Sequence, residues 1–593
     1  MEKIENIKKF NFKTKIKVMN CKKMKILGVH IGHDASSSLI IDGKIIASAA
    51  EERFVRIKHY GGMPLKAAAY CLKEGGLAPK DIDIIAYSGH LGDRRLNTMF
   101  RLGSSTLSKI KGGGTSFKRL IKEQMKSFMS VSGDPPLYFE SITLGSSTDI
   151  HYIPHHKSHA ASAYYTSGNS EKTLVITSDG AGEDGNSMTI WLAEDGKMKL
   201  LKEYSTEYSY GHFYSAVTEA LGWWVGDGEG TVMGLAPYGE IDTVPEGELS
   251  WLMPKFEAGE FVAPIEFGHI SATEYQDTYH WHFKVSERIG VVVDKYGKEA
   301  VAARLQDMLE KEMIHFISYW QKETESAYGV TAGGVFLNVK LNQKIIEAGI
   351  FKDYYIFPDA GDTGISAGAA LAICAEKGGS FNSERIKNVN WGPSYSNEVI
   401  KAILDERSLS YSRSDDIGKE IAIELANGKI VGWFQGRMEC GPRALGGRSI
   451  LYDARQAENK DIVNRTVKFR ESFRPFCPSM KVESASKYLE NSERIERYMI
   501  SSYTVKTGMR DEIAAVTHVD GTCRPQMIER GVYPKFWNLL NEYEKLTGSP
   551  VLMNTSLNVK GEPIVCNPHD AIKCFYDTGI QVLVLGSYIL RKS

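Results

Sequence analysis

Residues 26–41 read ILGVHIGHDASSSLII, and residues 173–197 read TLVITSDGAGEDGNSMTIWLAEDGK. Each stretch is an apolar strand, a short polar turn with an aspartate (Asp34 or Asp179), and a second strand that runs toward an Asp-Gly turn. The turn of such a hairpin can face a phosphate or a metal ion. Two copies predict a duplicated α/β domain with a cleft between its halves, and two unrelated hairpins are the alternative.

A histidine pair precedes the second hairpin. In HYIPHHKSHA (151–160), His155 and His159 are four residues apart, so they share one face of a helix. Two imidazoles on one face are a common metal-binding pattern, although a structural histidine pair is the alternative. Asp179, at the end of the following strand, favours the metal interpretation.

Length and composition set broad limits on the class of protein. A chain of 593 residues predicts at least two domains, and 42% hydrophobic and 24% charged residues are ordinary for a soluble globular protein. The net charge of −1 argues against nucleic acid as a partner. No apolar run is long enough for a membrane span. The eight cysteines form no CxxC pair and the Lys-rich N-terminus has no apolar signal core, so we expect a cytoplasmic protein.

Composition along the chain predicts four segments. We expect residues 1–23 to form a disordered tail and residues 24–376 to form the duplicated domain. Residues 377–394 are polar with glycine and proline and are typical of a linker. Helix and strand patterns then alternate through residues 395–593, which indicates a second α/β domain.

Cations in the second domain lie among glycines and prolines rather than along a helix face. They are concentrated in GRMECGPRALGGRSILYDAR (436–455), VNRTVKFRESFRPFCPSM (463–480), THVDGTCRPQ (517–526) and MNTSLNVKGEPIV (553–565). Guanidinium groups in rigid loops suit several phosphate oxygens at once, so these segments predict an anion cradle. A solvated basic surface is the alternative. No GxxxxGK[ST] motif is present, which argues against a P-loop.

Several longer motifs carry a resemblance to a known family. They are GVHIGHDASSSLIIDGKIIASAAEERFVRIKHYGG, IPHHKSHAASAYYTSG, TSDGAGEDG, VMGLAPYG (232–239), AGGVFLNVKLN, GRMECGPRALGGRSIL and SFRPFCPSM. Together they span most of residues 24–593 in order and resemble the O-carbamoyltransferase family, which includes nodulation protein U, cephem carbamoyltransferase and tobramycin carbamoyltransferase.

The resemblance implies a fold and an activity. The fold would be a duplicated actin/Hsp70-like domain (ASKHA, Kae-like) followed by a smaller YrdC-like α/β domain. The second domain would make carbamoyl-adenylate from carbamoyl phosphate and Mg-ATP. The first domain would use a divalent metal, with iron favoured and manganese or zinc as alternatives, to transfer the carbamoyl group to a hydroxyl of a small-molecule acceptor, such as a secondary metabolite. A homodimer is also compatible with the resemblance.

The resemblance also assigns roles to residues. The implied metal ligands are His155, His159, Asp179 and Asp362. The implied nucleotide or carbamoyl-adenylate contacts are Gly333, Gly334, Asn338 and Asn342, with Lys58 as a further candidate. The implied site for carbamoyl phosphate and ATP comprises Arg443, Arg448, Lys468, Arg470, Arg474, Arg524, Asn554 and Ser556. The acceptor hydroxyl needs a general base, for which we consider His33 and Asp34 on the opposing hairpin, with Asp227 third.

One departure and two alternatives accompany this interpretation. Thr231 stands before VMGLA, where family members often carry a lysine, and this change predicts an altered charge preference for the acceptor. A relative that acts on tRNA or on a protein is one alternative, and the near-neutral charge disfavours tRNA. A non-catalytic nucleotide-binding regulator is the other, but it would need neither the histidine pair nor the cationic loops.

Overall fold

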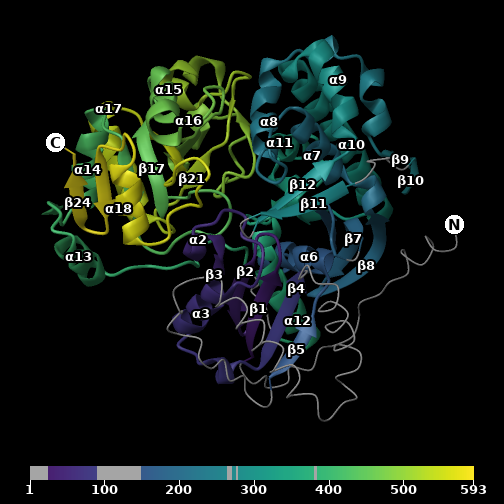
Figure 1. The fold of residues 1–593 in the computed structure, drawn as a ribbon, viewed down its shortest axis with the longest axis horizontal. Coiled ribbons are helices and arrows are strands. Elements are labelled where there is room, and N and C mark those ends of the chain that lie inside the picture. Colours follow the sequence, from purple (N-terminus) through teal and green to yellow (C-terminus); the bar gives the residue numbers. More distant parts are fainter. Residues whose placement is uncertain are drawn as a thin grey trace.

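The computed structural model of the chain describes residues 24–89, 148–183, 185–263, 270–275, 278–379 and 384–592. The predicted tail, residues 1–23, lies outside this described part. Figure 1 shows a first domain coloured purple to teal and a second domain coloured green to yellow beside it.

The first domain is built from two five-stranded sheets with the same strand order. The first sheet has the order β3-β2-β1-β4-β5, with strands β1 Lys25–Ile31, β2 Ser36–Ile41, β3 Lys44–Ala50, β4 Ile84–Gly89 and β5 Asp149–Tyr152. The second has the order β14-β13-β6-β7-β8, with strands β6 Thr173–Ser178, β7 Asn186–Glu194, β8 Lys197–Ser205, β13 Tyr328–Ala332 and β14 Asp353–Ile356. In each sheet three antiparallel strands are followed by two parallel ones. The predicted duplication is therefore confirmed.

Two helices occupy equivalent positions in the two halves and pack against each other. Helix α6 (His155–Thr166) follows β5 and lies on the second sheet, whereas α12 (Ile365–Glu376) follows β14 and lies on the first. The contact is close because Gly368 has no side chain: a Cβ there would lie 1.9 Å from the carbonyl oxygen of Ser158. Gly28 on β1 allows α12 the same approach through Ser366.

A helical region is inserted in the second half, between β8 and β13. Its helices are α7 Tyr210–Ala220, α8 Glu229–Leu235, α9 Ser286–Tyr296 and α10 Lys298–Thr324. Helix α10 buries Leu305, Phe316 and Ile317 in a core shared with α7 and α9. Helix α11 (Val339–Glu347) follows β13 and leads back to the sheet. The second domain is faced by α8 of this region and by α11.

The second domain has one eight-stranded mixed sheet covered by helices on both faces. Its order is β15-β24-β23-β16-β17-β22-β18-β21, with strands β15 Ser412–Arg413, β16 Val431–Phe434, β17 Arg448–Asp453, β18 Cys477–Lys481, β21 Gln526–Ile528, β22 Val551–Ser556, β23 Val582–Leu585 and β24 Tyr588–Arg591. Helices α13 (Asn397–Glu406) and α18 (Pro568–Tyr576) pack in one core. Helices α14 (Ile417–Ala426) and α17 (Pro534–Thr547) pack in the other. The predicted smaller α/β domain is confirmed.

Side chains of the first domain donate hydrogen bonds to backbone carbonyls of the second domain. Arg53 in α2 (Glu52–Val55) donates to Gly441 O at 2.9 Å, and Arg56 donates to Pro563 O and Ile564 O at 2.7 Å each. On the other side of the interface, Asn342 donates to Ile500 O at 2.6 Å. These contacts fix how the two domains meet.

Candidate metal centre and anion site

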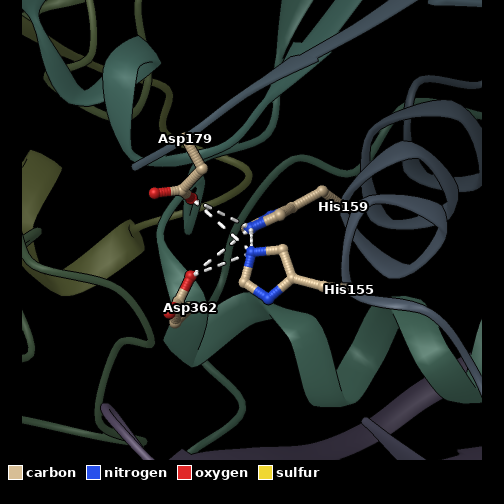
Figure 2. A group of neighbouring side chains, drawn as sticks. All are labelled: His155, His159, Asp179 and Asp362. Atoms are coloured by element: carbon tan, nitrogen blue, oxygen red, sulfur yellow. Dashed lines mark hydrogen bonds and ion pairs between the residues drawn. The ribbon is translucent and has the colours of Figure 1, made fainter. Parts of the chain in front are cut away.

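The four predicted metal ligands converge on one point of the first domain (Figure 2). His155 and His159 stand on the first turns of α6, Asp179 follows β6, and Asp362 lies in the turn before α12. One ligand atom from each lies within 4.8 Å of the other three. The Nε2 atoms of the two histidines are 3.1 Å apart, and His159 Nε2 lies 3.2 Å from Asp179 Oδ2 and 3.4 Å from Asp362 Oδ1.

Neighbouring groups hold two of these ligands in a metal-binding orientation. The Asp179 carboxylate accepts the backbone N–H of Gly334 at 2.8 Å. His155 Nδ1 lies 3.3 Å from the Glu183 carboxylate, which leaves its Nε2 lone pair toward the cluster. Tyr152 OH donates to Glu183 at 2.8 Å and holds that carboxylate in turn. Glu183 was not predicted, although GAGEDG places it only four residues after Asp179.

The geometry of the cluster fits a divalent metal ion. Ligands bound at about 2.1 Å in a tetrahedron are roughly 3.4 Å apart, which is close to the separations between these atoms. Two imidazoles and two carboxylates are also a donor set that iron, manganese or zinc accepts. Although burial opposes the charge, the carboxylates raise the pKa of both His155 and His159, so the pocket attracts a cation. His155, His159, Asp179 and Asp362 are therefore the residues that would hold a metal.

The predicted nucleotide-contact residues divide between this centre and the domain interface. Gly333 and Gly334 lie against the Asp179 turn, and a Cβ at Gly333 would lie 2.2 Å from Ser178 O. Asn338 caps α11, accepting from Leu341 N at 3.0 Å. Asn342 is fully buried, and its amide donates to carbonyls of both domains. The glycines thus border the centre, whereas both asparagines have structural partners.

The predicted general-base residues also come together, and His59, which was not among the candidate bases, joins them. Asp34 lies 3.1 Å from His33 Nδ1 and 2.9 Å from His59 Nδ1, and the two imidazole rings stack 5.5 Å apart. Asp227 pairs with Lys58 and lies 3.7 Å from His59 Nε2. Although burial opposes the charge, Asp34 and Asp227 raise the pKa of His59 to about 10. His59 follows Lys58 directly, but nothing in its spacing points to this contact.

The loop that carries Asp227 lies against His33. A Cβ added to Gly226 would be 3.6 Å from His33 Nε2, so the loop backbone faces this nitrogen. Thr231, at the position where the resemblance implied a lysine, is 2% exposed in α8. The hydroxyl-bearing side chain therefore lies inside the helical region rather than on its surface.

Four of the predicted cations of the second domain form one partly buried cluster, comprising Arg443, Arg470, Arg474 and Arg524. Burial, followed by repulsion from Arg524 and Arg474, lowers the pKa of Arg443 to about 9. Burial, followed by repulsion from Arg474 and Arg524, also lowers the pKa of Arg470 to about 9. Arg474 lies 3.8 Å from Glu471. Among the described residues, no carboxylate lies within ion-pair distance of the other three, so Glu471 offsets only part of the positive charge of the cluster.

The remaining predicted anion-site residues have protein partners, as does Arg470 of the cluster, whose Nε donates to Asn464 Oδ1 at 2.7 Å. Lys468 donates to the carbonyl oxygens and side chains of Ser556 and Asn558. Asn554 is buried and donates to Ala444 O at 3.2 Å. Arg448 is fully buried: it donates to Pro393 O at 2.8 Å, to Gly447 O at 2.9 Å and to two further carbonyls, and its guanidinium stacks 3.6 Å over Phe434. The structure does not bring Arg448 into the arginine cluster.

Comparison with known proteins identifies the family. Residues 25–371 match the model described as the carbamoyltransferase N-terminus, and residues 422–592 match the carbamoyltransferase C-terminus. The chain belongs to the carbamoyltransferase family. It is 35% identical to nodulation protein NolNO of Sinorhizobium fredii, across 94% of this chain and 79% of that protein. It is 28% identical to nodulation protein U of the same species, across 91% of this chain and 94% of that protein. It is 30% identical to protein MJ1051 of Methanocaldococcus jannaschii, across 96% of this chain and 99% of that protein.

Membership makes this protein an enzyme that transfers carbamoyl groups. Both family regions are present, and one contains the His/Asp cluster whereas the other contains the arginine cluster. Among the described residues, no helix combines the length and the apolar character that a membrane crossing requires.

The first prediction for this carbamoyltransferase concerns metal content. We expect dialysed protein to retain about one equivalent of a divalent metal and His159→Ala to retain none, because the variant loses a ligand. Glu183→Gln should weaken metal affinity roughly 10- to 100-fold, because it frees the His155 ring. Metal analysis of dialysed protein gives the readout, with His282→Ala, an exposed histidine paired with Glu219, as the control. Equal metal in His159→Ala and the wild type would refute the site.

The second prediction concerns the pH dependence of stability. A raised pKa makes the His59 contribution complete below its unfolded pKa of about 6.5 and lost as pH rises through about 10. His59→Gln should therefore lower the free energy of unfolding by about 2 kcal/mol near pH 6, and this difference should shrink toward pH 10. Urea unfolding at several pH values measures the effect, and His282→Gln serves as the control. A difference that does not change with pH contradicts the assignment.

Proposed function

We propose that this carbamoyltransferase is ATP-dependent, that it forms carbamoyl-adenylate in the second domain, and that it transfers the carbamoyl group in the first domain to a hydroxyl of a small-molecule acceptor. The arginine cluster is the single observation that carries this proposal. Three guanidinium groups of this partly buried cluster have no carboxylate within ion-pair distance among the described residues, and together they favour an anion with several oxygens. A polyphosphate and carbamoyl phosphate both supply such oxygens.

The proposed activation takes place in two steps, a hydrolysis and a displacement at phosphorus. Hydrolysis of carbamoyl phosphate gives carbamate and phosphate. A carbamate oxygen then attacks the α-phosphorus of Mg-ATP, the bond from that phosphorus to the bridging oxygen breaks, and pyrophosphate leaves. In this step Arg443, Arg470 and Arg524 would hold the phosphates in line and offset the charge that builds up on them. The product is a mixed anhydride, whose carbonyl carbon is open to attack by a hydroxyl.

The proposed transfer step takes place beside the metal centre. A metal held by His155, His159, Asp179 and Asp362 would supply Lewis-acid stabilisation of the AMP phosphate. The acceptor oxygen bonds to the carbonyl carbon, the anhydride bond breaks, and AMP leaves with its phosphate. His33 is the candidate base for the hydroxyl proton: Asp34 lies at its Nδ1, so its Nε2 faces the Gly226 loop. His59 would keep Asp34 ionised and correctly placed.

The net charge of the chain and the distribution of its cations favour a small-molecule acceptor over a nucleic acid. With a net charge of −1, the chain offers no bulk attraction to tRNA. The cations of the second domain are gathered in one partly buried cluster rather than spread along a surface, which suits a small anion better than a nucleic-acid backbone.

The third prediction tests the adenylation site. Wild-type protein with ATP, Mg²⁺ and carbamoyl phosphate should release AMP and pyrophosphate, and release should depend on carbamoyl phosphate. Arg443→Ala should slow this release roughly 30- to 150-fold, because it removes charged hydrogen bonds worth about 2–3 kcal/mol. Arg413→Ala, which alters an exposed arginine paired with Asp415, is the matched control. AMP release at the wild-type rate in Arg443→Ala would exclude the cluster as the adenylation site.

A further inference from the structure

The chain enters the loop that carries Arg470 through an uncommon turn. Helix α15 (Glu458–Val463) ends in a π-helical turn over Asn464–Lys468, in which the Phe469 N–H donates to Asn464 O, five residues back. Phe469 then adopts a left-handed backbone, with a φ of 48°, and its ring is exposed. A π-turn and a left-handed aromatic residue are both rare, and both are concentrated at functional sites. The next residue is Arg470, a member of the arginine cluster.

The side chain of Asn464 connects separate parts of this loop. It is 2% exposed, and its Nδ2 donates to the carbonyl oxygens of Ser472 and Arg474 at 3.4 and 3.2 Å. Because these contacts hold the amide nitrogen, Oδ1 points toward Arg470, whose Nε donates to it at 2.7 Å. One buried amide therefore fixes both the course of the loop and the Arg470 side chain.

Two further contacts orient the Arg470 guanidinium. Its Nη2 donates to Pro475 O at 3.2 Å, and its central carbon lies over the Phe476 ring, 4.5 Å from the ring centre. Two of the three nitrogens are thus bound by the protein, and the place of the third follows because the group is planar. The guanidinium is therefore oriented before any ligand binds.

The group that holds Arg470 is neutral, whereas another arginine of the same domain is held by a carboxylate. Arg455 donates to both carboxylate oxygens of Asp453, through bonds of 2.8–3.2 Å. Such a carboxylate offsets the charge of its arginine, but an amide oxygen carries no net charge. Asn464 thus fixes Arg470 without placing a negative charge beside it that would repel a bound anion.

We propose that Asn464 is a positioning residue of the anion site, which holds the Arg470 guanidinium ready for a phosphate group and leaves its full charge available. The inference rests on the proposed function for the nature of the anion, a phosphate of ATP or of carbamoyl phosphate. A long side chain that the ligand itself must immobilise costs affinity, and a side chain that is already held avoids this cost. Loss of the amide should therefore weaken anion binding through Arg470.

The test measures the affinity of the full chain for inorganic pyrophosphate by calorimetry, in a double-mutant cycle. Asn464→Ala should weaken binding about three- to tenfold, because the ligand must then immobilise Arg470 itself. Arg470→Ala should weaken binding roughly 10- to 150-fold, because charged hydrogen bonds to the anion are lost. In the Arg470→Ala background, Asn464→Ala should change the affinity by less than about twofold, because the two residues act through one contact.

Asn459→Ala is the matched control for loss of a buried amide. Asn459 lies on the same helix, is 8% exposed and donates to Asp453 O at 3.0 Å. Its removal should leave the affinity for pyrophosphate within about twofold of the wild type, because it has no contact with the arginine cluster. An equal loss from Asn464→Ala in both backgrounds, or an equal loss in Asn459→Ala, would overturn the inference.

A second variant keeps the proposal falsifiable if Asn464→Ala does not fold. Asn464→Asp has nearly the same shape and keeps an acceptor for Arg470, but it adds a negative charge. It should weaken pyrophosphate binding at least about threefold, because the carboxylate offsets the Arg470 charge. Asn459→Asp, the same substitution on the same helix, should stay within about twofold of the wild type. Wild-type affinity in Asn464→Asp would refute the role given to a neutral partner.

The outcomes separate this inference from the proposed function. Pyrophosphate binding needs no adenylation, so coupling between Asn464 and Arg470 in a protein that releases no AMP would refute the proposed function and leave the positioning role in place. Carbamoyl-phosphate-dependent AMP release without such coupling would refute the positioning role alone. A wild-type protein that binds no pyrophosphate would also overturn the inference.

Discussion

The close contact between α6 and α12 is the constraint on which the candidate metal centre depends. Each helix follows the fifth strand of its own half and packs on the sheet of the other, so both begin near the same point. The contact needs Gly368, because a Cβ there would meet the Ser158 carbonyl. Once it forms, His155 and His159 on one helix must lie beside Asp362 at the start of the other. Asp179 reaches the same point because its hairpin ends there.

The two domains gather different charged groups, and one segment of the first domain lies beside both sets. The first domain gathers imidazoles and carboxylates, and the second gathers guanidinium groups. The segment EERFVRIKH of the first domain contacts both sites. Its Arg53 donates to Gly441, two residues before Arg443, whereas its His59 holds Asp34. One short stretch of the first domain therefore lies beside both the arginine-rich loop and the His33–Asp34 group.

The sequence predicts the fold and much of the site, because hairpin, helix and motif patterns are local. The duplication is visible in two hairpins, and the four candidate metal ligands are each marked by a motif. What it does not predict is which side chains have protein partners. Arg448 and Arg443 stand five residues apart in one glycine-rich motif, yet backbone carbonyls surround Arg448, whereas Arg443 has no carboxylate within ion-pair distance in the described part of the chain and joins the cluster. His59 and Glu183 act through contacts made only in three dimensions, so no spacing rule identifies them.

The central claim of this account is that the carbamoyl group is joined to AMP before transfer. The most direct measurement uses carbamoyl phosphate labelled with ¹⁸O in its carbamoyl oxygens and follows the mass of the AMP formed with ATP and Mg²⁺. If a carbamate oxygen attacks the α-phosphorus, AMP must carry ¹⁸O when the carbamoyl group leaves, and Arg443→Ala must lose this labelled product. Formation of ADP in place of AMP, or of AMP without label, would contradict the account.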